Sequence, residues 1–157
     1  MSLKPAPDGV RLLKQMRDTV EALFVRRAPV RQLLLTLELR VKLEEQVLLP
    51  ALLDCGLPRS TMVTYERDWK AMRDLAAQAQ VAHACAAREE AVLCALEGVA
   101  TLHFAELDRL IERYRGELDR EALGHDIQAL LHRWQDELAS TGDIEDEECD
   151  PVGLPPR

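Results

Sequence analysis

Five ionisable side chains lie within or beside apolar helical patterns in this chain, and the carboxylates and the histidine among them could bind a metal. Arg17 stands within one such pattern, and Arg40 and Glu44 lie one turn apart in the next. His103 lies in a later pattern, with Asp108 close by. Charged groups are rarely buried unless they are paired or bind a metal, and helical bundles build their sites from side chains at mid-height of facing helices. These residues therefore predict either a metal site or a buried charge network inside a bundle.

The elements that position these residues are expected to be helices. Abundant Leu, Ala, Glu and Arg, with few β-branched or aromatic residues, favour helix over strand. Apolar spacing predicts five helices: from Asp8-Gly9 to near Arg27, from Pro29 to about Asp54, from a cap at Ser60 or Thr61, from a turn between Ala84 and Glu90 to about Arg115, and from Asp119 to about Ala139. One long helix running through the turn between Ala84 and Glu90 is the alternative.

Short connections make neighbouring helices antiparallel. The prediction is therefore an all-α fold, an up-down antiparallel four-helix bundle with an additional C-terminal helix. Residues 1–139 form a single helical domain in this reading, and residues 140–157 form an acidic, proline-containing tail.

Charge and composition limit the partners that can be expected. The net charge is −8, but six acidic residues fall between Asp143 and Asp150, and residues 1–139 hold 19 basic and 22 acidic residues. Such a nearly neutral body lacks the basic surface that nucleic acid or an anionic membrane would require. The four cysteines show no paired metal spacing, and no signal peptide or long apolar span is found. The expected location is therefore the reducing cytoplasm.

The stretch from Leu39 to Leu52 resembles the second helix of hemerythrin-like (HHE) domains. In that family a His, a Glu four residues later and a closing Phe/Leu-Pro hold one side of a di-iron centre. Here Glu44 and Pro50 are in place, but Arg40 stands at the His position. Arginine is always protonated and has no lone pair to offer a metal.

Two further patterns carry the same resemblance, which covers roughly residues 8–135. The first-helix pattern His-x-x-Val-x-x-Leu-Phe corresponds to residues 17–24, with Arg17 at the ligand position. The His-x-x-x-x-Asp pattern of the last ligand-bearing helix is intact as His103 and Asp108. His83 is the one candidate for the His of the third helix.

Three functional hypotheses follow from these residues. In the first, the protein is a non-catalytic binding or regulatory module without a cofactor. Its interior network of Arg17, Arg40, Glu44 and Asp108 replaces the metal, and it binds a protein partner or a second copy of itself. In the second, it is an iron-based oxygen or redox sensor whose metal site has fewer ligands than that of the family. These ligands are Glu44, His83, His103 and Asp108. In the third, the interior arginines hold an anion or small ligand. The sequence has no nucleotide loop or nucleophile motif, so no catalytic residue is assigned.

Overall fold

The computed structural model describes residues 6–141, and these residues form helices without strands. The elements are α1 (Gly9–Val25), α2 (Val30–Leu43), the π-helical turn η1 (Glu44–Leu48), α3 (Leu49–Asp54), α4 (Arg59–Ala82), α5 (Ala86–Arg113) and α6 (Arg120–Ser140). The predicted all-α class is thus confirmed for this part of the chain. Apart from Ser140 and Thr141, the predicted acidic tail lies outside the described residues, as does Cys149.

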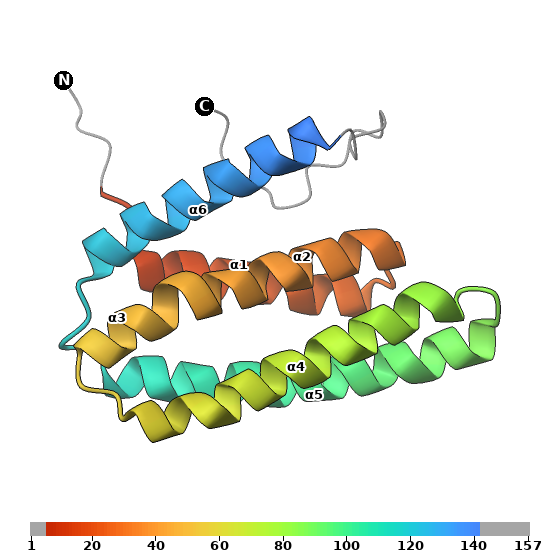
Figure 1. The fold of residues 1–157 in the computed structure, drawn as a ribbon, viewed down its shortest axis with the longest axis horizontal. Coiled ribbons are helices and arrows are strands. Elements are labelled where there is room, and N and C mark those ends of the chain that lie inside the picture. The colour runs from red at the N-terminus through yellow and green to blue at the C-terminus, as the bar shows by residue number, and fades with distance from the viewer. Residues whose placement is uncertain (1–5, 142–157) are drawn as a thin grey trace.

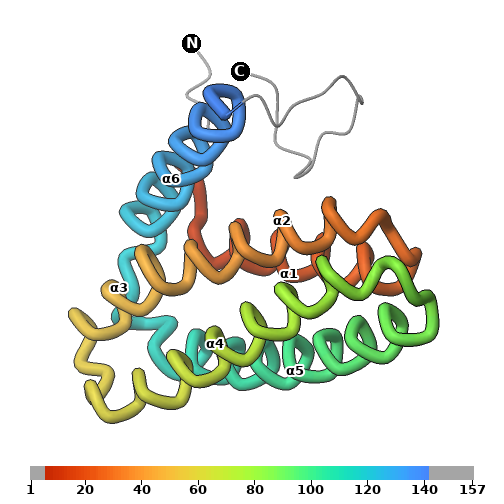
Figure 2. The backbone as a smooth tube through the Cα atoms, turned by 45° about the vertical axis from the view of Figure 1, so that its right-hand side comes forward, coloured from red at the N-terminus to blue at the C-terminus, as the bar shows by residue number. Residues whose placement is uncertain are grey.

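The helices are arranged in layers (Figure 1). One layer is the pair α1 and α2, with η1 and α3 continuing α2, and the other is the pair α4 and α5. Across the layers, α2 packs against α4 and α1 against α5. Helix α6 covers the outer side of the first layer, and its C-terminal half diverges from the other helices (Figure 2). None of the described helices is long and apolar enough to cross a membrane.

Several predicted boundaries agree with local hydrogen bonding. Asp8 caps α1 by accepting hydrogen bonds from the backbone N–H groups of residues 10 and 11, and Asp119 caps α6 by accepting one from Ala122. Helix α3 ends at Asp54 with Cys55 as its C-cap, and the next residue, Gly56, has a φ of 99°, the left-handed conformation that glycine adopts readily.

Two predictions at α4 and α5 need correction. Neither Ser60 nor Thr61 caps α4, because the helix begins one residue earlier and Pro58 occupies the cap position without a side-chain hydrogen bond. The alternative of one continuous helix is wrong, since residues 83–85 form a turn between α4 and α5. This turn lies at the start of the predicted window, and Cys85 is the N-cap of α5 in an extended conformation.

Pro50 explains the π-helical turn that precedes it. Proline has no N–H to donate, and in an α-helix its ring would clash with the carbonyl of the residue four positions earlier, Gln46. The backbone widens instead, and the N–H of Leu49 bonds to the carbonyl of Glu44, five residues back. The extra residue in this turn lets Leu48 and Leu49 both be fully buried, while Glu44 keeps its place on the buried face.

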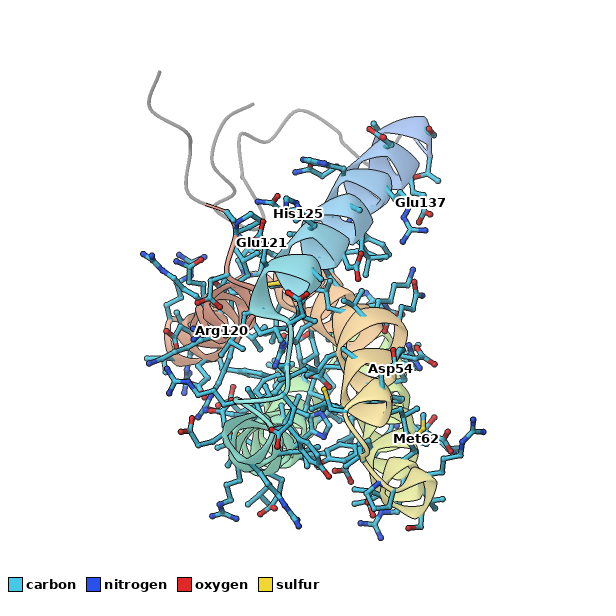
Figure 3. The ribbon with its side chains drawn as sticks, turned by 90° about the vertical axis from the view of Figure 1, so that its left-hand side faces the viewer. Asp54, Met62, Arg120, Glu121, His125 and Glu137 are labelled. Carbon is cyan, nitrogen blue, oxygen red and sulfur yellow. The ribbon has the colours of Figure 1, made fainter. Side chains whose placement is uncertain are left out.

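A close crossing of α1 and α6 attaches the last helix. At this crossing a Cβ on Gly124 would meet the Pro7 carbonyl oxygen, and one on Gly9 would meet Leu123, both well inside van der Waals distance. Arg120 lies at the start of α6 (Figure 3). It donates hydrogen bonds to the Asp8 carboxylate at the same crossing. The approach of these two helices therefore requires residues without side chains at both glycine positions.

We expect Gly124→Ala to lower the free energy of unfolding by about 1–3 kcal/mol, because the added methyl group meets backbone that cannot move aside without separating the helices. Urea denaturation followed by circular dichroism measures this. Gly98→Ala is the matched control: Gly98 is helical and exposed, with nothing near its missing Cβ, and the same change there should stabilise by up to about 1 kcal/mol. Equal effects of the two changes would contradict the close crossing.

Candidate functional site

The carboxylate of Glu44 is the centre of a buried polar cluster between the two layers. Its Oε2 atom accepts a 2.9 Å hydrogen bond from Nε1 of Trp69 on α4 and lies 2.6 Å from Nε2 of His103 on α5. Its Oε1 atom lies 3.1 Å from Nε of Arg40, one turn earlier in α2. Arg40, Glu44 and His103 are each no more than 1% exposed. Three helices thus contribute partners to one buried carboxylate.

His103 bridges two carboxylates. Besides the contact with Glu44, its Nδ1 atom lies 3.2 Å from Oδ2 of Asp68 on α4. The ring of Tyr65 packs edge-on against it, with centroids 5.7 Å apart. Both ring nitrogens can donate a hydrogen bond only in the imidazolium form. The geometry therefore favours a protonated His103 between two acids.

The electrostatic surroundings set the protonation states. Burial alone would lower the pKa of His103, but hydrogen bonds and charge attraction from Glu44 and Asp68 raise it above its ordinary value. Burial would raise the pKa of Glu44, yet the charge of Arg40 and the bonds from His103 and Trp69 lower it. Burial, with a smaller contribution from the charge of Arg17, lowers the pKa of Arg40, and Glu44 opposes that shift. Glu44 is consequently ionised and paired.

Arg17 belongs to a second, more exposed ion pair. Its guanidinium contacts the carboxylate of Asp108 on α5, and its Nε donates a 2.8 Å hydrogen bond to Glu21. The Arg17 side chain is 25% exposed and that of Asp108 is 43% exposed. The four residues of the predicted interior network therefore form two pairs, and only the pair of Arg40 and Glu44 is fully buried.

The structure does not assemble the four candidate metal ligands. Glu44 and His103 are in contact, but Asp108 pairs with Arg17. His83 lies at the end of α4, where it is exposed and borders a groove of about 540 Å³ between α2 and α4. It follows Trp69 by 14 residues, roughly 21 Å along a helix axis. Within residues 6–141, no group of three or more His, Cys, Asp or Glu side chains is arranged to hold a metal ion.

Helix α4 supplies two side chains to the buried cluster that the sequence did not predict. Neither Trp69 nor Asp68 is among the predicted site residues, yet both contact the cluster. A signal for Trp69 was present, because an indole N–H in a buried stripe needs an acceptor. Asp68 has no comparable signal in the sequence, since its partner is 35 residues away.

Comparison with known proteins adds no assignment. No family model, curated protein or solved structure matches this chain.

We expect Glu44→Ala to lower the free energy of unfolding by about 3–5 kcal/mol, because the buried Arg40 guanidinium loses its counter-charge and Trp69 its acceptor. Thermal and urea denaturation measure the change. Lys70→Ala, which removes an exposed ion pair with Asp74, is the control and should leave the midpoints unchanged. A Glu44→Ala melting temperature within a degree or two of wild type would show that the network contributes little.

The raised pKa of His103 predicts a pH dependence of stability. The protonated form is favoured in the folded state, so its contribution is complete below the ordinary imidazole pKa of about 6.5 and is lost as pH rises through the higher folded value. Unfolding free energies measured at a series of pH values should fall over that window. His103→Gln should flatten this fall, whereas His132→Gln, on an exposed position of α6, should preserve it. A fall that persists in His103→Gln would have to arise elsewhere.

Proposed function

We propose that this protein is a non-catalytic binding or regulatory module, built on a hemerythrin-like up-down four-helix bundle whose di-iron site is replaced by a charge network. The observation that carries the proposal is the buried ion pair of Arg40 and Glu44. These two residues stand at the positions where the hemerythrin-like pattern has a metal-binding His and Glu. A guanidinium against the carboxylate supplies the positive charge that a metal would otherwise bring.

The arrangement of helices supports the bundle in this proposal. Helices α1, α2, α4 and α5 each have two of the others as neighbours. Arg17, Arg40 and Asp108 come from three of these four, and Glu44 begins η1, which continues α2. The α4 positions facing the cluster hold Asp68 and Trp69 in place of His. A metal at this site would meet two arginines and would have to displace the contacts that Glu44 already makes.

The same contacts make the network a poor catalytic centre. Arg40, Glu44 and His103 are almost completely buried, so a substrate could not reach them without separating the layers. A module of this kind acts through its outer surface, and the partner we propose is another protein or a second copy of the chain. Sedimentation over a range of concentrations tests self-association directly.

Metal analysis tests the loss of the iron site. Wild-type protein, purified without an affinity tag or chelator, should contain no stoichiometric iron and no oxo-bridge absorption in its ultraviolet–visible spectrum. Two irons per chain would overturn the proposal, because neither arginine could then occupy its present position.

A reversal experiment tests the hemerythrin-like ancestry of the site. The double variant Arg17→His/Arg40→His would place two imidazoles beside Glu44, His103 and Asp108, so we expect it to gain iron binding and the associated absorption. The control carries the same changes at the exposed Arg11 and Arg113 and should gain neither. If the double variant folds and still rejects iron, the alignment of these helices with the family is wrong.

A further inference from the structure

The guanidinium of Arg40 is buried without full hydrogen bonding. The residue is 1% exposed, and its Nε and Nη1 atoms have no hydrogen-bond partner in the described part of the chain. The same is true of Oε1 of Glu44. The ring of Phe104 lies 5.4 Å from the guanidinium carbon. Buried donors and acceptors left unpaired destabilise a fold, and more so when they are charged, so these atoms require a partner.

Glu44 cannot satisfy Arg40 by turning its carboxylate. The 3.1 Å separation of Arg40 Nε and Glu44 Oε1 is a close charge contact, but it lacks the geometry of a hydrogen bond. Rotation toward the guanidinium would draw Oε2 away from His103 and Trp69, which hold it at 2.6 and 2.9 Å. The carboxylate is therefore fixed by the other two helices.

The charges around these atoms identify the chemistry of the missing partner. The buried charges of Arg40 and protonated His103 are balanced by Glu44 and Asp68. The more exposed ion pairs nearby are balanced too, since Arg17 pairs with Asp108 and Glu21, and Arg67 lies near Asp68. An added anion or cation would bring an uncompensated buried charge, which is strongly unfavourable. The partner must be neutral, must accept from Arg40 and must donate to Glu44. Water has this chemistry and is the smallest molecule that does.

We propose that one water molecule is held between Nη1 of Arg40 and Oε1 of Glu44 as a permanent part of the fold. It accepts a hydrogen bond from Nη1 and donates one to Oε1, so that these two atoms gain a partner without moving Glu44, while Nε keeps its 3.1 Å charge contact with Oε1. Because the site is enclosed by α2, α4 and α5, the water leaves only when the helices separate. Its residence time is long compared with that of surface water.

Magnetic relaxation dispersion of water oxygen-17 measures such long-lived internal waters. Wild-type protein should show a dispersion whose amplitude falls by one water molecule in Arg40→Met, since methionine offers the water no hydrogen-bond donor. Arg113→Met is the control, because Arg113 is exposed and its loss should leave the amplitude unchanged. An Arg40→Met amplitude equal to that of wild type would overturn the proposal.

A high-resolution crystal structure of the wild-type protein gives an answer even if Arg40→Met does not fold. Density for one water within hydrogen-bond distance of both atoms supports the proposal. A direct bond between the two side chains, or an anion beside Arg40, overturns it. The inference rests on the network geometry and not on the partner role: iron-free protein lacking this water would overturn the inference alone, whereas iron in the protein would overturn the proposed function.

Discussion

The rest of the structure depends on a single buried negative charge. An ionised carboxylate is stable inside a protein only while oppositely charged groups and hydrogen-bond donors surround it. Glu44 receives these from the preceding helix α2 through Arg40, from α4 through Trp69 and from α5 through His103. Since α2 belongs to one layer and α4 and α5 to the other, the charge connects the two layers at one point.

Pro50, six residues after Glu44, determines the shape of the backbone that carries this carboxylate. The proline prevents a regular helical hydrogen bond to Gln46, and the resulting π-turn starts at Glu44 itself. A regular helix through this region would turn later apolar residues such as Leu49 and Leu52 away from the core that they now fill. One residue without an N–H thus allows a buried acid and a continuous apolar face to coexist in one helical segment.

Local features of the fold could be predicted from the sequence, whereas contacts between distant segments could not. Asp8, Gly56 and Asp119 mark helix ends because capping depends on neighbouring residues, and the one-turn spacing of Arg40 and Glu44 makes them neighbours in any helix. The contacts of Asp68 with His103 depend on how α4 is positioned against α5, which periodicity does not specify. His83 is the one histidine available for the third helix of the resemblance, but its position at the end of α4 is far from the cluster.

A buried polar network also does something for the fold that an apolar core would not. Well-packed apolar residues of similar volume often stabilise a core as much as a buried ion pair does, so stability alone gives no reason to keep it. Directional bonds, however, distinguish one helix alignment from another. A shift of α4 by one turn would remove Trp69 from Glu44 and Asp68 from His103. The misaligned form would then bury a carboxylate and an imidazolium with partners missing, and this difference selects a single alignment of the two layers.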